Sequence, residues 1–341
     1  MNVGVDARHL DAGRGIAVYL EGMLGALHGV RISLLVPGRA PLGPAAVALA
    51  ARRDVRVVRT RAPGRALYAS AAAAGEPTLA RLLGAVDVLW IPAPAPVAPG
   101  PLPYVLTVHD RSFEVRPGDF TPYERLWHRL ARPRELARGA ARVVTDTAAV
   151  RDELRDAWGL ERVTVVAPGV RRPAEVAATA GDYVLFVGAL EPRKDPVAVA
   201  RAAAAAGIRA RFAGTGRLEG AVRAAGGELL GRVTDAELDA LLAGALALVL
   251  PSHLEGFGFP PLEAALRGTP SVVRDLPVLR ETLGDEGALF VAGEREIADA
   301  IARLRAEPWL RASLSAHAAA RAPRWENAAE ALRAVLAEAA A

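Results

Sequence analysis

Short apolar strands alternate with helices along the whole chain, and this alternation restricts the fold more than any other feature. In residues 1–167, seven short apolar segments predict strands, and helical patterns separate several of them. After a stretch with proline and glycine near residues 168–182, the rhythm restarts with six more strand candidates. Such alternation favours parallel sheets with helices on both faces. Because it occurs twice in 341 residues, about the length of two domains, we predict an α/β protein with two doubly wound, Rossmann-like domains.

The two predicted domains place the expected ligand site at the ends of their strands. We place the first domain at residues 1–167 and the second at residues 168–324. Sheets of this type bind ligands at the carboxyl ends of their strands, so we expect the two domains to face each other across an interdomain cleft. The strand candidates are residues 2–6, 30–37, 55–60, 87–92, 104–109, 142–147 and 163–167, followed by 183–188, 209–213, 228–233, 245–251, 271–274 and 288–291.

Composition excludes several classes of protein. The chain has no cysteine, which excludes disulfides, iron–sulfur clusters and a cysteine nucleophile. It has no Asp-x-Asp pair, so we expect no metal site. No apolar stretch reaches about 18 residues, as a membrane-spanning helix requires. The N-terminus lacks the basic-then-apolar order of a signal peptide, and we therefore expect a cytoplasmic protein.

Positive charge is concentrated in the first half of the chain. Residues 1–167 hold 22 arginines against 16 acidic residues, a net charge of +6, whereas the remainder has a net charge of −2. A basic surface of this kind suits an anionic membrane or a charged acceptor, although a solvated helix face is the simpler explanation. Nucleic acid is disfavoured as a partner because aromatic residues are only 5% of the chain and do not interleave the basic run. We expect peripheral contact with the inner face of an anionic membrane. The densest basic run consists of Arg125, Arg129, Arg132, Arg134, Arg138 and Arg142.

Two glutamates in residues 251–264, PSHLEGFGFPPLEA, form the strongest motif of the second domain. Glu255 is expected in a loop, and Glu263 in the first turn of a helix over residues 260–267. Gly256 and Gly258 allow a ligand to approach the backbone closely. A carboxylate accepts two hydroxyl hydrogens at once, as a ribose diol offers. We predict that Glu263 binds a ribose beside phosphates at the helix N-terminus, while Glu255 faces the other end of the ligand. The alternative is a stabilising helix glutamate and an ordinary turn glutamate.

A second motif, residues 186–196, FVGALEPRKDP, lies between a predicted strand and a helix for which Asp195 is the expected N-cap. Arg193 and Lys194 follow the carboxyl end of the strand, where a bound diphosphate is expected. Two cations there can neutralise a diphosphate leaving group without a metal. Lys194 is the single lysine among 42 basic residues, which favours a chemical role that arginine does not fill. A solvated basic loop is the alternative.

His109 is a further candidate, since it ends an apolar strand and Asp110 follows it. A histidine in this position is as often structural as functional, and its own context leaves both roles open.

These motifs together resemble the retaining glycosyltransferases of family 4, which have the GT-B fold. The first half is most similar to bacterial mannosyltransferase-type members that build surface polysaccharide. One departure is Ala189, which stands where many relatives have arginine. The resemblance covers essentially the whole chain and rests on residues 13–16 (GRGI), 107–110 (TVHD), 166–170 (VAPGV), 188–194 (GALEPRK), 231–233 (GRV) and 255–263.

The resemblance implies a role for each matching residue. The implied catalytic residues lie around the transferred sugar and the diphosphate, and are His109, Arg193, Lys194 and Glu255. The implied donor-binding residues contact the ribose, the base, the phosphates and the sugar, and are Gly13, Gly15, Gly231, Arg232, Val233, Gly256, Phe257, Gly258 and Glu263.

The resemblance also implies the reaction and the partners. It implies a metal-independent enzyme that moves a hexose, with mannose favoured, from a GDP- or UDP-sugar, without a cofactor. The acceptor is a glycan, a lipid-linked sugar or a small molecule. A final helix in residues 325–341 is implied to cross back to the first domain. Two alternatives stay open: a sugar-nucleotide epimerase of similar fold, and an inactive nucleotide-sugar-binding or partner protein.

Overall fold

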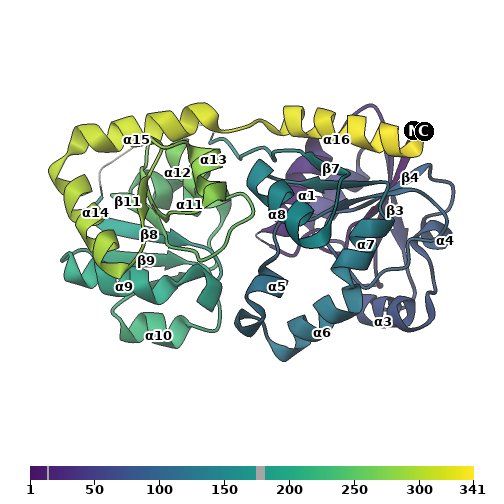
Figure 1. Ribbon diagram of the computed structural model, residues 1–341, viewed down its shortest axis with the longest axis horizontal. Helices are drawn as coiled ribbons and strands as arrows, with labels where there is room; N and C mark the ends of the chain where they lie inside the picture. Colours follow the sequence, from purple (N-terminus) through teal and green to yellow (C-terminus); the bar gives the residue numbers. More distant parts are fainter. Residues whose placement is uncertain (14, 174–180) are drawn as a thin grey trace. The chain divides into compact units, whose positions relative to one another are not determined.

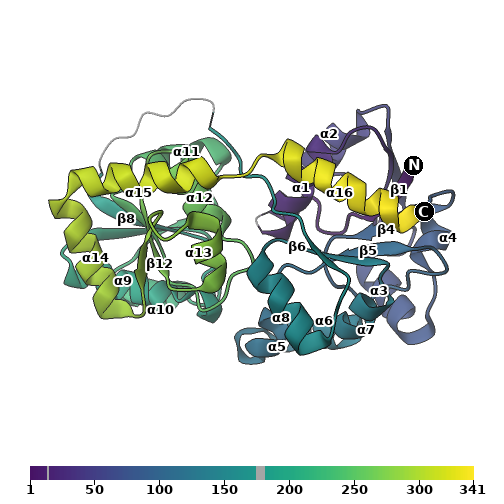
Figure 2. The same cartoon turned by 45° about the horizontal axis from the view of Figure 1, so that its top comes forward.

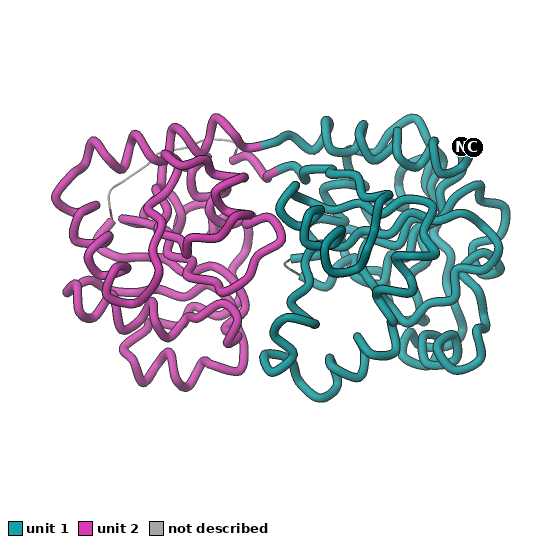
Figure 3. The backbone as a smooth tube through the Cα atoms, viewed as in Figure 1, with its two compact units in different colours: residues 1–169, 323–341 teal, residues 170–322 magenta. Residues whose placement is uncertain are grey.

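The computed structural model describes residues 1–13, 15–173 and 181–341. The chain divides into two compact units, each built around one parallel sheet (Figures 1 and 3). Unit 1 comprises Met1–Gly169 and Pro323–Ala341, and unit 2 comprises Val170–Ala322. The two parallel sheets agree with the α/β architecture that the strand–helix alternation predicts.

Unit 1 contains a seven-stranded sheet in the order β3-β2-β1-β4-β5-β6-β7. All its strand pairs are parallel, and the four residues of β4, VLWI, are all buried, as expected for a strand covered on both faces. The order reverses between β1 and β4, which makes their carboxyl ends the switch point of this sheet. The strands are β1 (Asn2–Asp6), β2 (Arg31–Val36), β3 (Val55–Arg59), β4 (Val88–Ile91), β5 (Tyr104–Thr107), β6 (Arg142–Thr145) and β7 (Val163–Val165).

The last helix of the chain, α16 (Trp325–Ala340), belongs to unit 1. It packs against α1, β4 and β5, and Figure 2 shows it lying along α1. A Cβ atom on Gly22 of α1 would stand 2.3 Å from Trp325 Cε2, so glycine at this position lets the indole ring pack on the helix. The other helices of unit 1 are α1 (Ile16–Ala26), α2 (Pro44–Ala50), α3 (Gly64–Ala74), α4 (Leu79–Leu83), α5 (Ser112–Val115), the 3-10 turn η1 (Pro117–Asp119), α6 (Pro122–Ala131), α7 (Pro133–Gly139) and α8 (Ala148–Trp158).

Unit 2 contains a six-stranded parallel sheet in the order β10-β9-β8-β11-β12-β13. Alternate residues of β8 enter different apolar clusters: Val184 and Phe186 join one, Leu185 and Val187 the other. Both faces of the sheet are therefore covered. The strands are β8 (Tyr183–Val187), β9 (Arg209–Ala213), β10 (Glu228–Gly231), β11 (Ala247–Leu250), β12 (Ser271–Arg274) and β13 (Leu289–Val291).

The helices of unit 2 supply the other side of these clusters. Leu238 and Leu242 of α11 join one cluster, whereas Val199 of α9 and Ile301 of α14 join the other. These elements are the 3-10 turn η2 (Pro192–Lys194), α9 (Pro196–Ala205), α10 (Glu219–Ala224), α11 (Asp235–Ala243), α12 (Phe259–Ala265), α13 (Pro277–Leu283), α14 (Glu294–Ala306) and α15 (Pro308–Arg321).

Several expected element boundaries differ from those of the structure, and three of them have a clear backbone cause. The strand expected at residues 228–233 ends at Gly231, whose φ of +69° leaves the extended region. The helix expected at residues 260–267 begins at Phe259, after Gly258 with φ +88°, so Glu263 lies in its second turn rather than its first. The basic run does not share one helix, since α6 ends before Arg132, which has φ +44° and precedes Pro133.

Candidate functional site

The loops after β8 and β11 meet at the switch point of the unit 2 sheet. The strand order reverses between these two neighbours, and ligands of such sheets bind outside the carboxyl ends at this place. The β8 loop carries Arg193 and Lys194, and the β11 loop carries Glu255. The backbone N–H of His253 donates to the Arg193 carbonyl oxygen at 2.8 Å and ties the two loops together. The structure therefore brings three of the four predicted catalytic residues to one edge.

Lys194 and Glu255 form an ion pair between these loops. The Lys194 Nζ donates to Glu255 Oε1 at 2.5 Å, and the two side chains are only 14% and 8% exposed. Lys194 belongs to the short turn η2, in which its backbone N–H donates to the Glu191 carbonyl oxygen at 2.9 Å. The turn thus fixes a single ammonium group at the switch point, beside a carboxylate from the neighbouring strand.

Arg274, which the sequence motifs did not single out, extends this edge to a third strand. It ends β12, and its Nη2 donates to Asp195 Oδ2 at 3.2 Å. His253 Nε2 lies 3.5 Å from the same Asp195 oxygen. The expected N-cap hydrogen bond from Asp195 is absent, because the residue has φ +50° and its carboxylate faces Arg274. An arginine at the end of an otherwise buried strand is the signal that would have found this residue.

Glu263 lies on α12 and is buried, with 6% of its surface exposed. Two arginines surround this part of the helix. Arg267, itself buried, donates from Nη1 to the Glu263 carbonyl oxygen at 2.6 Å and from Nε to Asp239 Oδ1 at 2.7 Å. Hydrogen bonding to Asp239 raises the pKa of Arg171, and the nearby charge of Glu263 adds to that effect. The Glu263 carboxylate is therefore held beside fixed positive charge.

Backbone geometry explains the glycines of the Glu255–Glu263 motif. Gly258 caps α12 in the left-handed region, and a Cβ there would stand 2.5 Å from Leu279 Cδ2. The Phe257 side chain is 4% exposed and packs edge-on against Phe259 at 5.1 Å between ring centroids. Its ring belongs to the core, so only the backbone of Phe257 is suited to contact a ligand.

Glycines also end the strands on the other side of β8. Gly231, at the end of β10, has φ +69°, and its carbonyl oxygen accepts from the Gly214 N–H at 2.8 Å. A Cβ on Gly214 would stand 1.9 Å from the Gly188 carbonyl oxygen. The backbones that follow β8 and β9 thus lie so close together that a side chain at position 214 would not fit. Gly214 was not among the predicted site residues. The predicted Gly231 ends the outer strand β10, and the exposed Arg232 and half-buried Val233 follow it.

Unit 1 holds His109 at the carboxyl edge of its own sheet, between three neighbouring strands. The Nδ1 atom lies 2.8 Å from Asp146 Oδ2, and Nε2 lies 3.0 Å from the Pro92 carbonyl oxygen. Both partners are acceptors, so the ring satisfies both only as an imidazolium that donates from each nitrogen. Burial lowers the pKa of His109, but the charge and hydrogen bond of Asp146, the charge of Asp110 and the hydrogen bond to the Pro92 carbonyl oxygen together leave the pKa raised.

Asp146 was missed by the sequence analysis, although it directly follows the buried strand β6. The edge of the Tyr19 ring, carried by α1, approaches His109 at 4.6 Å between ring centroids. The loop before α1 contains Gly13 and Gly15, with φ of +101° and +75°, while Arg14 of the same motif lies outside the described residues. These two glycines, like His109, belong to unit 1.

We expect Asp146→Asn to destabilise the protein more at low pH than at high pH. A raised folded-state pKa means that the stabilisation by charged His109 is fully present below the unfolded pKa of about 6.5 and is lost as pH rises through the folded pKa. The midpoint of thermal unfolding of wild type and variant, measured from pH 5.5 to 9, checks this. Asp152→Asn, which removes an exposed carboxylate paired with Arg151, is the control. A difference from wild type that stays constant with pH would contradict the imidazolium assignment.

A second unpredicted cluster lies at the switch point of unit 1. Asp6 ends β1, is fully buried, and accepts a hydrogen bond from the Tyr68 hydroxyl at 2.8 Å. Arg8 forms an ion pair with Asp6 and donates from Nη2 to the Ala93 carbonyl oxygen at 2.9 Å. The Arg8 guanidinium also lies 5.8 Å from the ring centroid of Trp127 on α6. This cluster links the carboxyl edge of the sheet to α6.

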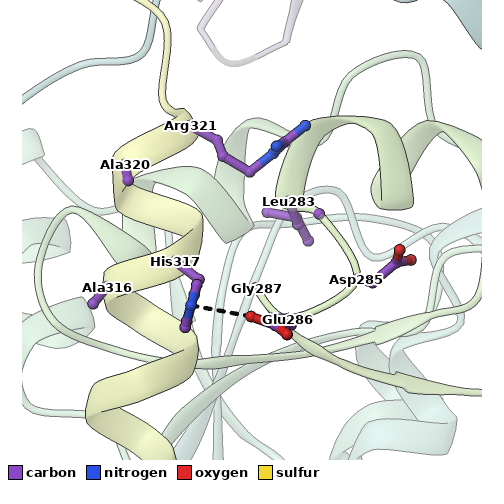
Figure 4. A pocket seen from close by; sticks show the side chains of 9 residues that line it. Leu283, Asp285, Glu286, Gly287, Ala316, His317, Ala320 and Arg321 are labelled. Carbon is purple, nitrogen blue, oxygen red and sulfur yellow. Dashed lines mark ion pairs between the residues drawn. The ribbon is translucent and has the colours of Figure 1, made fainter.

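A shallow hollow of about 610 Å³ lies elsewhere in unit 2, between α15 and the loop after α13 (Figure 4). Its polar feature is a pair in which His317 Nε2 lies 3.1 Å from Glu286 Oε2, both well exposed. The loop leads into β13, so the hollow is at the amino edge of the parallel sheet, opposite the strand ends that carry Lys194 and Glu255. None of the predicted site residues lines it.

No group of three or more histidine or acidic side chains in the described residues is arranged to hold a metal ion. Among the same residues, no helix has both the length and the apolar character to cross a bilayer.

Two protein-family models match the chain, one on each unit. The model described as glycosyltransferase family 4 matches residues 13–172, and the model described as glycosyl transferases group 1 matches residues 171–321. Among solved structures, HepE from Anabaena in complex with UDP and glucose is similar, with a TM-score of 0.70 and 16% identity over 99% of each chain. At this identity the likeness establishes the fold alone, and it confirms the GT-B fold.

Curated relatives match parts of the chain. The D-inositol 3-phosphate glycosyltransferase of Frankia alni is 32% identical over 233 residues, 57% of this chain and 57% of that protein. The O-antigen chain mannosyltransferase RfbU of Salmonella typhimurium is 50% identical over 60 residues, 18% of this chain and 17% of that protein. The chain thus spans little more than half the length of the first relative and under a fifth of the second.

Proposed function

Because the chain belongs to the glycosyltransferases of group 1 and family 4, we propose that it moves a hexose from a nucleoside-diphosphate sugar to an acceptor hydroxyl, with retention at the anomeric carbon. The observation that carries this proposal is the Lys194–Glu255 pair at the switch point of unit 2. Donor binding belongs to unit 2, and the acceptor side belongs to unit 1.

The residues of unit 2 suit a nucleoside-diphosphate sugar from one end to the other. Glu263 takes the ribose diol, and Arg193 with Lys194 takes the diphosphate. Glu255 takes hydroxyls of the hexose, assisted by the backbone around Gly256. Lys194 and Glu255 share one hydrogen bond. An ammonium has three hydrogens to donate and a carboxylate has two acceptor oxygens, so the pair can also bind the sugar nucleotide.

The chemistry needs little from the protein beyond charge and position. The bond between the anomeric carbon and the diphosphate oxygen breaks, and negative charge grows on the diphosphate beside Lys194 and Arg193. The acceptor oxygen bonds to the anomeric carbon from the same face, and its proton passes to the departing diphosphate. His109 of unit 1 is the remaining candidate for this chemistry, and its two ring nitrogens are held by Asp146 and by the Pro92 carbonyl oxygen.

The proposal extends to the hexose and to the acceptor. Mannose is the favoured hexose, supported by the 60-residue match to a mannosyltransferase. The nucleotide is UDP or GDP, and the UDP complex of HepE supports the uridine form. The acceptor is a glycan, a lipid-linked sugar or a small polyol phosphate, the last supported by the inositol-phosphate relative.

A panel of UDP- and GDP-sugars, scored by thermal shift and then by mass analysis of products with candidate acceptors, tests this function. We expect one donor to raise the melting temperature and to yield a glycosylated acceptor, with turnover unchanged in EDTA because Lys194 and Arg193 replace a metal. Loss of activity in EDTA that one divalent ion restores would contradict the metal-independent mechanism. A changed sugar released without any acceptor would instead identify an epimerase. A thermal shift without product from any acceptor would favour a binding protein.

A further inference from the structure

Helix α6 presents an apolar stripe on the outside of unit 1. Tyr123, Leu126 and Leu130 are 53%, 52% and 41% exposed. They are three and four residues apart, which places them on one face of the helix. Val115, shortly before α6, is 55% exposed as well. These four are most of the strongly exposed large apolar side chains in the described part of the chain, the others being Val47 and Trp309.

The face of α6 next to this stripe fixes the helix to unit 1. The Trp127 ring packs against Tyr68 at 5.5 Å between centroids, and His128 stacks on Phe113 at 4.9 Å. Tyr68 is the residue whose hydroxyl bonds Asp6 at the switch point of the sheet. Thr121 and Glu124 close the N-terminus of α6 with a capping box. The outward stripe is therefore displayed on a rigid helix and does not arise from a frayed segment.

Exposed arginines border the stripe. Arg125 and Arg129 lie beside Leu126 and Leu130 on the exposed part of α6, and Arg65 of α3 lies over the Tyr123 ring at 5.4 Å. The rest of the basic run has partners of its own: Arg134 pairs with Glu114, Arg142 with Glu338, Arg132 with Glu135, and Arg138 donates to the Trp158 carbonyl oxygen. Of the basic run, only Arg125 and Arg129 therefore lie beside the apolar stripe, together with Arg65 of α3.

We propose that α6 docks unit 1 on an anionic lipid bilayer, with Tyr123, Leu126 and Leu130 entering the headgroup region and Arg125 and Arg129 binding lipid phosphates. Apolar side chains flanked by arginines on one exposed helix face match the chemistry of an anionic interface. Tyrosine suits the same region because its ring is apolar and its hydroxyl is polar. The segment between β5 and β6 contains α6 and begins at the carboxyl end of β5, next to His109. Docking through α6 therefore brings the carboxyl edge of the unit 1 sheet towards the lipid surface.

Co-sedimentation with vesicles tests the docking without any donor or acceptor, so its outcome is separate from that of the proposed reaction. Wild type is expected to bind vesicles of equal parts phosphatidylcholine and phosphatidylglycerol, to bind phosphatidylcholine alone at least tenfold more weakly, and to lose binding as salt screens the charges (about 8 Å Debye length at physiological ionic strength). Arg125→Glu with Arg129→Glu, and separately Leu126→Ser with Leu130→Ser, are each expected to lower binding at least about tenfold.

Matched controls keep the test specific. Arg223→Glu with Arg333→Glu makes the same change in net charge at exposed positions on α10 and α16, and Val47→Ser with Trp309→Ser removes the exposed apolar side chains outside the patch. Both controls should bind like wild type, and all variants should keep the wild-type melting temperature. Equal binding to neutral and anionic vesicles, or α6 variants that bind like wild type, would overturn the proposal. A wild-type dimer that the α6 variants abolish, without vesicle binding, would assign the face to a second copy of this chain instead.

Discussion

Alanine in place of Lys194 is expected to lower kcat by about 10²–10³-fold, as the loss of one donor to the charge of a transition state does. Negative charge grows on the diphosphate as the sugar–oxygen bond breaks, and only an interaction that strengthens with that charge lowers the barrier. Steady-state kinetics with the donor found in the sugar-nucleotide panel measure the effect. The affinity for the donor should change less than kcat.

The Lys194–Glu255 ion pair supplies a control that the sequence alone did not. Removing Lys194 also leaves the 8% exposed Glu255 side chain without its partner, which could disturb the loop independently of chemistry. Glu255→Gln in the Lys194→Ala background removes that unpaired charge. If the double variant regains most of the turnover, Lys194 acts by neutralising the charge of Glu255, and the leaving-group role is wrong. Lys194→Arg should recover only part of the activity, because guanidinium is planar and larger than ammonium. Full activity in Lys194→Arg would mean that the single lysine has no special role.

Glu263→Ala is expected to weaken binding of the nucleoside diphosphate by about 1.5–3 kcal/mol, the range for hydrogen bonds to a charged group, or roughly 10- to 150-fold in affinity. Glu263 is buried on α12, its backbone carbonyl oxygen accepts a hydrogen bond from Arg267, and its charge acts on nearby Arg171, so the carboxylate has a defined position for the ribose hydroxyls. Isothermal titration with the nucleoside diphosphate measures the loss.

A modified nucleotide separates ribose binding from damage to the fold. The 2′,3′-dideoxy analogue lacks both hydroxyls and should bind wild type and Glu263→Ala with similar affinity. If the variant loses affinity equally for both nucleotides, Glu263 supports the fold around Asp239 and does not contact the ribose.

Strand ends were the most predictable part of this protein, because buried parallel strands are nearly continuous apolar runs. The loops that follow β8, β11 and β5 therefore supplied Lys194, Glu255 and His109 as candidates before the structure. The pairing between strands was not predictable in the same way. Asp146 meets His109 only because β6 lies next to β5, and Arg274 meets Asp195 across β8, β11 and β12. Spatial neighbours of this kind are 37 and 79 residues apart in sequence, where no local pattern connects them.

The predicted helix boundaries were wrong where the backbone conformation of one residue, rather than the apolar periodicity, sets the end of a helix. Two prolines at positions 260 and 261 suggested that the helix begins there, but the left-handed Gly258 starts it at Phe259 and moves Glu263 to the second turn. Arg132 precedes a proline, which disfavours a helical conformation and divides α6 from α7. That division orients α6 separately from α7, and periodicity across the basic run concealed it.

The helix α16 gives the protein an order of assembly. Its side chains Leu332, Val335 and Leu336 are buried in unit 1, yet the ribosome makes them after all of unit 2. Unit 2 is one continuous segment and can close its core while the chain is still growing, whereas unit 1 waits with the Gly22 surface of α1 uncovered until Trp325 arrives. Synthesis of α16 is thus the condition for a finished first unit, and a product cut short before α16 leaves an apolar seam for chaperones and proteases to recognise.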